Sequence, residues 1–317
     1  MNELLKVILL SVMASVLSSA IFIPFIKNKN IGQPIREEGN KAHYAKAGTP
    51  TMGGIAFLIV FVIMTLIFSK INANLVFILV STIGFGFIGF IDDYEKVTKK
   101  QNLGLNEKQK ILLQLILAAV VSLWAYFTKE FNAGSLYIPF IKQPLNIGFL
   151  YVPLAIFIII GTVNATNLTD GVDGLLTSVS IPVFFGIALM SILFLPDLTV
   201  SALVFASVLI GFLAFNSNPA SVFMGDTGSM AIGGAFVSMM LALNRPIFII
   251  FLGGIYLIEA LSLIIQVSYF KRTKRRVFLM SPIHHHYELK GYKEPKIVAS
   301  FTVISVLLTV FTLYLLV

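Results

Sequence analysis

Residues 198–215 read LTVSALVFASVLIGFLAF, a run without a single charged side chain. A helix of about 20 mostly apolar residues is long enough to cross a lipid bilayer. This stretch therefore predicts a membrane-spanning helix, and the same pattern recurs along the whole chain.

Nine further stretches have the same character, so we expect an all-α polytopic membrane protein with about ten transmembrane helices. These stretches are 3–26, 52–69, 75–91, 111–127, 150–163, 176–195, 229–244, 246–270 and 296–317. The ninth span along the chain, 246–270, contains Gly253-Gly254 and is expected to be bent or broken there. We expect one integral membrane domain over residues 1–317.

The composition agrees with a membrane protein and excludes other classes. Of the 317 residues, 57% are hydrophobic and 12% are charged, and the charged share is about half that of a soluble protein. A soluble globular enzyme and a disordered chain are therefore excluded. The absence of Cys excludes thiolate nucleophiles, iron–sulfur clusters and thiolate zinc sites.

Basic residues indicate the orientation in the membrane. The expected loops on one face are 27–51, 92–110, 164–175, 216–228 and 271–295. The first, second and last of these, taken to Lys296, carry 18 of the 23 Lys and Arg, and basic loops face the cytoplasm. Both chain ends should then be extracytoplasmic. A cleaved signal peptide is the alternative for the first span, but its apolar run continues to Ile26, which favours a retained helix.

Five of the six Asp fall in three of these cytoplasmic segments. They are Asp92 and Asp93, Asp170 and Asp173, and Asp226. An Asp at a membrane boundary is costly unless it is paired or bound to a cation, and several converging carboxylates suit Mg²⁺, which bridges phosphate oxygens. The alternative is that these Asp end helices and face water. Their clustering on one face favours the metal site.

Two neighbouring features point to a bound phosphate ligand. Asn164, Asn167 and Asp170 recur every three residues, so on a helix they would form a polar stripe from which Asp173 drifts away. Lys46, Lys96 and Lys108 lie close to the acidic segments, where lysines could hold a diphosphate beside a metal. Each lysine taken alone also fits a plain cytoplasmic anchor.

Three consecutive histidines and one intramembrane acid complete the unusual residues. His284, His285 and His286 diverge on any regular backbone, so they are not expected to bind one ion together. They fit a polar wall for a large anionic or sugar-bearing ligand, or a solvated loop. Glu259 lies within the ninth span, where an acid is either functional or paired with Gln266 or a neighbouring helix.

The order of these motifs resembles a known family. The segments are IDDYEK at 91–96, the Asn- and Asp-rich run 164–175, FMGDTGS at 223–229 and PIHHH at 282–286. Together they resemble the polyprenyl-phosphate sugar-1-phosphate transferases. The run from Lys46 to Gly54 and the His triplet with Glu288 are similar to the branch that transfers phospho-N-acetylmuramoyl-pentapeptide.

The resemblance implies a fold, a reaction and partners. The fold is a ten-helix homodimer in the bacterial inner (cytoplasmic) membrane, with a lipid groove beside a bent ninth helix and the active site facing the cytoplasm. The reaction passes phospho-N-acetylmuramoyl-pentapeptide from UDP-N-acetylmuramoyl-pentapeptide to undecaprenyl phosphate, giving lipid I and UMP with Mg²⁺ as cofactor. This is the first membrane step of peptidoglycan synthesis, and no nucleic acid is implied.

The resemblance also implies residue roles. Asp226 would bind the metal, Asp92 would deprotonate or orient the lipid phosphate, and Asp93 would assist. The implied substrate-binding residues are Lys46, Thr51, Lys96, Lys108, Asn164, Asn167, Asp170, Asp173, Phe223, Gly225, His284, His285 and His286. Direct attack by the lipid phosphate and a covalent phospho-aspartate route both remain open.

Three other functions are weighed against this one. The nearest is a sister enzyme that passes N-acetylglucosamine-1-phosphate to the same lipid, and donor choice separates the two. A transporter of lipid-linked sugars could carry intramembrane acids and broken helices, but it would release no UMP. A non-catalytic scaffold would keep its function when Asp226 is replaced by Ala.

Overall fold

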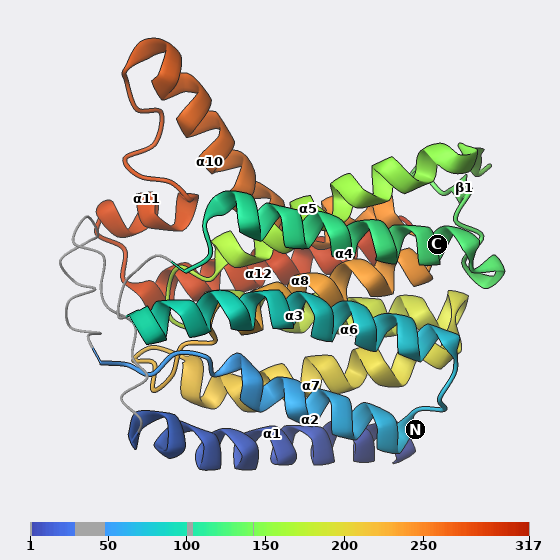
Figure 1. The fold of residues 1–317 in the computed structure, drawn as a ribbon, viewed down its shortest axis with the longest axis horizontal. Coiled ribbons are helices and arrows are strands. Elements are labelled where there is room, and N and C mark those ends of the chain that lie inside the picture. Colours follow the sequence, from blue (N-terminus) through green and yellow to red (C-terminus); the bar gives the residue numbers. More distant parts are fainter. Residues whose placement is uncertain (1, 29–47, 100–103, 142, 317) are drawn as a thin grey trace.

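The computed structural model describes residues 2–28, 48–99, 104–141 and 143–316, and these residues form a bundle of roughly parallel and antiparallel helices (Figure 1). The α-helices are α1 (Asn2–Asn28), α2 (Gly54–Phe68), α3 (Ala73–Lys99), α4 (Glu107–Phe127), α5 (Tyr151–Thr169), α6 (Leu175–Phe194), α7 (Thr199–Asn216), α8 (Gly225–Ala242), α9 (Ile249–Leu252), α10 (Gly254–Thr273), α11 (Ile283–Leu289) and α12 (Glu294–Tyr314). Short 3₁₀ turns are η2 (Lys129–Phe131), η3 (Gly148–Leu150), η4 (Pro196–Leu198) and η5 (Pro246–Phe248).

The all-α membrane architecture expected from the sequence is confirmed. Among the described residues, eight helices are long and apolar enough to cross a membrane. The remaining two predicted spans correspond to α2, which has 15 residues, and α8, which has 18. The total of ten spans stays a prediction. Figure 1 shows both marked ends of the chain at the end of the bundle that carries β1, and α11 at the opposite end.

The centre of the bundle is a close crossing of α3 and α8. Nearly every residue of α8 is buried, and its neighbours reach it because small residues line the contact. A Cβ on Gly89 of α3 would overlap the backbone carbonyl of Asp226, and the hydroxyl of Ser81 donates to the carbonyl of Gly234 at 3.2 Å. Small residues allow helix backbones in membranes to approach each other in this way.

Several predicted cytoplasmic loops are partly helical. Helix α3 continues to Lys99, so Asp92 and Asp93 lie on a helix rather than on a loop. Pairs spaced i,i+4 accompany this extension: Lys96 Nζ lies 2.6 Å from Asp92 Oδ2, and Lys99 Nζ lies 2.8 Å from Glu95 Oε2. Such pairs support a helix that has left the apolar region.

The ninth span is interrupted, as the two glycines predict. Helix α9 ends at Leu252, Gly253 takes a non-helical conformation (φ −94°, ψ 25°), and α10 begins at Gly254. A Cβ on Gly253 would lie 2.6 Å from the ring of Phe236 on α8, so this position also needs a small residue. In Figure 1, α10 leans away from the other helices.

The connection between α4 and α5 carries a small hairpin. Strand β1 (Ser135–Leu136) pairs antiparallel with β2 (Leu145–Asn146), with Ser135 opposite Asn146. The amide of Asn244, after α8, donates to the carbonyls of Asn132 and Ser135 at 3.0 and 2.9 Å. These bonds fasten the hairpin to the end of the bundle that lies away from α11.

Candidate active site

Three carboxylates from two helices meet where α3 crosses the start of α8. Asp92 and Asp93 of α3 and Asp226 of α8 each place one oxygen within 4.8 Å of the others. The first two are 3% and 0% exposed. The sequence places Asp226 more than 130 residues away from the other two, and the crossing of α3 and α8 brings them together.

Asp93 is fully engaged by the first turn of α8. Its Oδ1 accepts from the backbone N–H of Asp226 at 3.0 Å. Its Oδ2 accepts from the backbone N–H of Thr227 at 2.9 Å and from the hydroxyl of Thr227 at 2.7 Å. The first N–H groups of a helix lack partners within the helix and carry partial positive charge. Asp93 therefore acts as a cap supplied by another helix, and it holds Asp226 in place.

Asp92 and Asp226 share two lysines. Lys96 Nζ lies 2.6 Å from Asp92 Oδ2 and 3.1 Å from Asp226 Oδ2. Lys110 Nζ, from the first turns of α4, lies 2.6 Å from Asp226 Oδ2 and 4.0 Å from Asp92 Oδ2. Asp92 Oδ1 accepts from the backbone N–H of Leu105 at 2.9 Å. The two lysine side chains are 15% and 18% exposed, so these charges interact in a largely desolvated environment.

The polar stripe of α5 faces the same cluster. The Asn167 amide donates to Asp226 Oδ1 at 2.9 Å and to the hydroxyl of Ser229 at 2.8 Å. The Asn164 amide instead forms a reciprocal pair with Gln114 of α4, at 2.7 and 3.3 Å. Asn164 therefore fastens α5 to α4, whereas Asn167 orients the metal-ligand candidate Asp226.

Asp170 follows α5 directly and lies partly buried beside the cluster. Burial and the charges of Asp226, Asp93 and Asp173 raise the pKa of Asp170 to about 8. A carboxylate that is crowded by other carboxylates takes up a proton unless a cation joins the group.

Residues 50–54 form a short backbone ladder with residues 223–224. The N–H of Gly53 donates to the carbonyl of Phe223 at 2.9 Å, and the N–H of Phe223 donates to the carbonyl of Pro50 at 2.9 Å. This ladder brings Thr51 against Gly225, where the backbone has a positive φ of 72°. The Thr51 hydroxyl is buried and has no hydrogen-bond partner among the described residues. It is a polar group available to a ligand next to Asp93.

Asp173 has a different environment from Asp170. Its Oδ2 accepts from the backbone N–H of Ala220 at 3.0 Å and from the Asn218 amide at 3.2 Å, and its own N–H donates to Glu294 at 3.2 Å. It therefore joins the loop after α5 to the loop after α7 and to the start of α12. Helix α5 ends at Thr169, so Asp173 lies beyond the helix on which the predicted stripe depended.

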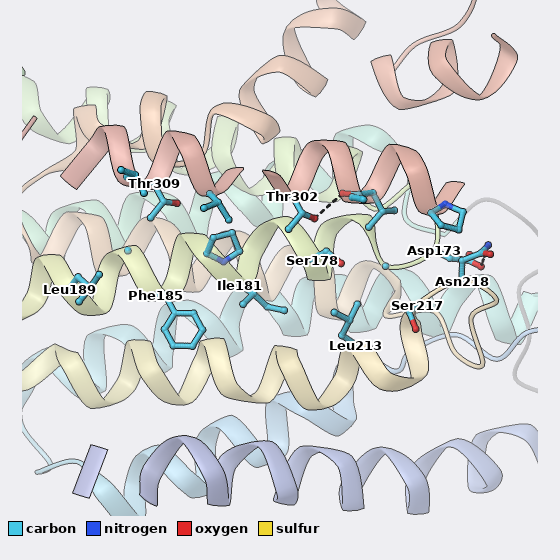
Figure 2. A pocket seen from close by; sticks show the side chains of 18 of the residues that line it. Asp173, Ser178, Ile181, Phe185, Leu189, Leu213, Ser217, Asn218, Thr302 and Thr309 are labelled. Carbon is cyan, nitrogen blue, oxygen red and sulfur yellow. Dashed lines mark hydrogen bonds between the residues drawn. The ribbon is translucent and has the colours of Figure 1, made fainter. Parts of the chain in front are cut away.

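Asp173 also lies at the polar end of an apolar cavity of about 790 Å³ between α6, α7 and α12 (Figure 2). Asp173, Ser217 and Asn218 line that end, and residues such as Ile181 and Phe185 line the rest. No residue of α10 lines this cavity. The lipid groove that the resemblance implies beside the ninth helix stays a prediction.

The three histidines on α11 point to three different partners. His284 Nδ1 lies 3.0 Å from Glu259 Oε2, and His285 Nδ1 lies 2.5 Å from Glu288 Oε2. His286 Nδ1 accepts from the backbone N–H of Leu279 at 3.1 Å. The side chains do not converge on one point, as the helical spacing predicts.

Glu259 is therefore paired, and its partner is His284 rather than Gln266. Gln266 accepts from the backbone N–H groups of Val277 and Phe278 at 3.0 and 2.9 Å. Of the two possibilities left open by the sequence, pairing with a neighbouring helix describes the observed contact.

Two predicted lysines have no observed place in the cluster. Lys46 lies outside the described residues. Lys108 has an exposed side chain on α4 and makes no ion pair with a described residue. Lys110 occupies the cluster instead. The signal for Lys110 is the reciprocal capping of Asn106 and Gln109, which starts α4 at Glu107 and puts Lys110 and Gln114 on one face.

The residues present could hold a metal ion. Three carboxylates offer hard oxygen ligands within reach of one another, and the carboxyl group of Asp170 lies nearby. Asp93 is held by the backbone and hydroxyl of the first turn of α8, whereas Asp92 and Asp226 face the side chains of Lys96 and Lys110. In the described protein, the lysines provide the positive charge between these two acids.

The fold and the site together define a polytopic membrane protein with an acidic and basic centre at the ends of its helices. Residues 75–244 match the family model described as "Glycosyl transferase family 4". The segment from α3 to the end of α8, which contains all three clustered carboxylates, is thus that of a membrane glycosyl transferase.

Individual proteins that match nearly the whole chain define a narrower family of transferases. The chain is 44% identical to the phospho-N-acetylmuramoyl-pentapeptide-transferase of Thermoanaerobacter sp. (strain X514), over 98% of each chain. It is 44% identical to that of Clostridioides difficile (strain 630), over 97% of this chain and 96% of the relative. It is 41% identical to that of Bacillus subtilis (strain 168), over 98% and 97%.

Residues 46–58 also match "Phospho-N-acetylmuramoyl-pentapeptide-transferase signature 1". The chain belongs to the phospho-N-acetylmuramoyl-pentapeptide-transferase family. The resemblance found in its motifs is confirmed.

Proposed function

We propose that this enzyme transfers phospho-N-acetylmuramoyl-pentapeptide from its UDP carrier to undecaprenyl phosphate, with lipid I and UMP as products. The single observation that carries the proposal is the cluster of Asp92, Asp93 and Asp226 with two lysines, at the ends of membrane-spanning helices. The family relationship specifies the donor.

The place of the cluster suits a reaction between a lipid and a soluble nucleotide. A lipid phosphate lies at the membrane surface, whereas a nucleotide sugar reaches the protein from water. The cluster stands at the end of α3 where Lys96 and Lys99 begin a basic segment. Because basic segments face the cytoplasm, we place the site on the cytoplasmic side of the bacterial inner membrane, with both chain ends outside.

The chemical obstacle is the approach of two anions. The lipid phosphate must attack the diphosphate of the donor, and UMP must leave with its negative charge stabilised. Lys96 and Lys110 are held between Asp92 and Asp226, so their cations are positioned before substrate arrives. Mg²⁺, when bound, would neutralise phosphate charge and align the reacting groups.

The three clustered acids would have different roles, which follow from their different contacts. Asp226 would hold the metal, since its two oxygens are oriented by Asn167 and the lysines. Asp92 would accept a proton from the lipid phosphate or orient it. Asp93 would keep Asp226 in place through the first turn of α8.

The remaining candidates surround this centre. Thr51, Phe223 and Gly225 would contact the nucleoside beside the ladder of residues 50–54, together with Lys46. Lys108 would hold phosphate with Lys96. Asp170 and Asp173 would shape the nucleotide side, with the stripe residues Asn164 and Asn167 as support. His284, His285 and His286 would face the sugar and peptide. The chain would work as a single membrane domain and as a homodimer.

The test is UMP release by purified protein with undecaprenyl phosphate and Mg²⁺. Two donors are compared, UDP-N-acetylmuramoyl-pentapeptide and UDP-N-acetylglucosamine, with Asp226→Ala as the inactive control. Release from the first donor alone, lost in the variant, is the expected result. Release from the second donor alone would make the protein the sister transferase, and release from neither by folded protein would contradict a transferase function.

A further inference from the structure

Glu259 is a buried acid to which the proposed reaction assigns no role, and it is paired with His284. Both side chains are 0% exposed, and Glu259 Oε2 lies 3.0 Å from His284 Nδ1. Glu259 Oε1 and His284 Nε2 are buried and have no hydrogen-bond partner among the described residues. An unbalanced polar pair inside a membrane protein is costly to keep, which marks it as functional.

The carboxylate determines which ring nitrogen of His284 carries the proton. The oxygens of a carboxylate can only accept hydrogen bonds, so a carboxylate at this position selects the ring protonated at Nδ1. In the neutral ring, Nε2 then has the lone pair and acts as an acceptor. Glu259 therefore fixes both the orientation and the tautomer of the His284 ring.

The fixed ring lies against the loop that follows α5. A Cβ on Gly171 would overlap His284 Nε2, so the ring lies directly on the backbone of this loop. The preceding residue is Asp170, which feels the charges of Asp226 and Asp93 in the carboxylate cluster. The chain of contacts thus runs from α10, through α11, to the acid beside the cluster.

This series of contacts begins just after the helix break at Gly253. Helix α10 begins at Gly254, and Glu259 is within its first two turns. Tyr256, on the same part of α10, bonds to Ser180 of α6 at 2.7 Å. The start of α10 is thereby fixed to the bundle, and Glu259 is presented to His284 from a rigid base.

We infer that Glu259 is a positioning residue of the transferase, which holds His284 as the Nδ1-protonated tautomer against Gly171 and so sets the loop that carries Asp170. The inference rests on the proposed function for its kinetic consequence. The tautomer itself does not depend on turnover.

The first test observes the tautomer. The chain contains only four His, so ¹⁵N-histidine labelling gives a simple NMR spectrum, and His284→Asn identifies the signal of His284. The expected signal is that of a ring protonated at Nδ1 in the wild-type protein, and it should change in Glu259→Gln. Glu288→Gln is the matched control, because it should alter the His285 signal and leave that of His284 intact.

The second test is kinetic. Glu259→Gln should lower kcat for UMP release by about 10- to 100-fold, as loss of an orienting partner commonly does, while its unfolding temperature stays near that of the wild type. Glu259→Asp keeps the charge and should recover part of the rate. Glu3→Gln removes an exposed carboxylate at the far end of the bundle and should have wild-type kcat.

The double variant Glu259→Gln/His284→Asn should be no slower than His284→Asn alone, because both substitutions disrupt the same contact between Glu259 and His284. Wild-type kcat in Glu259→Gln, or an unchanged His284 signal in that variant, would overturn the inference. Absence of UMP release from the wild-type protein would instead contradict the proposed function, and the NMR comparison would still decide the tautomer.

Discussion

Replacing Asp93 by Asn should loosen the first turn of α8 and thereby displace Asp226. Asp93 accepts three hydrogen bonds, from the backbone N–H groups of Asp226 and Thr227 and from the Thr227 hydroxyl. An Asn side chain has one oxygen and one NH₂ group in place of two oxygens. Whichever way the amide turns, its NH₂ group faces one of the two backbone N–H donors.

The magnitude follows from these contacts. One buried N–H without a partner costs about 1–3 kcal/mol. Loss of the negative charge at the helix N-terminus removes a further contribution of about 0.3–1 kcal/mol. The variant should therefore unfold with a free energy about 1–4 kcal/mol lower than that of the wild type. Its activity should fall strongly, because Asp226 moves with the turn.

The assay combines unfolding in detergent with UMP release in the presence of Mg²⁺. Thr227→Val is the matched control, since it removes the 2.7 Å hydroxyl bond and keeps both backbone bonds. This control should lose about 1 kcal/mol of stability and keep most of its activity. Asp93→Asn with wild-type stability and no activity would refute the anchoring role and make Asp93 a participant in the chemistry.

Three further predictions concern the same region. Gly89→Ala should lower the free energy of unfolding by about 1–3 kcal/mol or more, because its Cβ would overlap the carbonyl of Asp226. The control Gly161→Ala places a Cβ that meets nothing within 4 Å and should slightly stabilise α5. Unfolding in detergent compares the two variants, and equal stability would contradict the close crossing. Lys110→Met removes the cation 2.6 Å from Asp226 and should slow UMP release about 10- to 100-fold, so an unchanged rate in the steady-state assay would exclude it from the centre. Burial and neighbouring acids raise the pKa of Asp170 to about 8, so without metal the folded protein binds a proton that the unfolded chain releases near pH 4. Its unfolding temperature in EDTA should fall as the pH rises from about 4 to about 8, and Asp170→Asn should reduce this slope; an identical slope in the variant would contradict the shift.

The sequence predicts the membrane architecture well because its signal is local. Long apolar runs and the two glycines at 253–254 each act within about 20 residues of chain. The grouping of acids also follows from local data, since it needs only the side of the membrane on which each helix ends. The helical state of Asp92 and Asp93 did not follow, because α3 extends beyond its apolar segment.

The division of labour among the site residues depends on contacts that are distant in the sequence. Asp93 becomes a cap because the first turn of α8 arrives beside it. Lys110 reaches Asp226 because of the way α4 packs against the cluster, whereas the nearby Lys108 on the same helix is exposed. The partner of Glu259 comes from α11 rather than from its own helix. Residue types alone do not identify such partners.

The crossing of α3 and α8 has an evolutionary consequence. The spacing between the acids is set by two backbones in contact at Gly89, so no single side-chain replacement can adjust it gradually. Mutations that tune the enzyme toward another donor should then accumulate in the surrounding loops, where insertions are tolerated. A family can in this way diversify what it transfers and inherit its reacting centre unchanged.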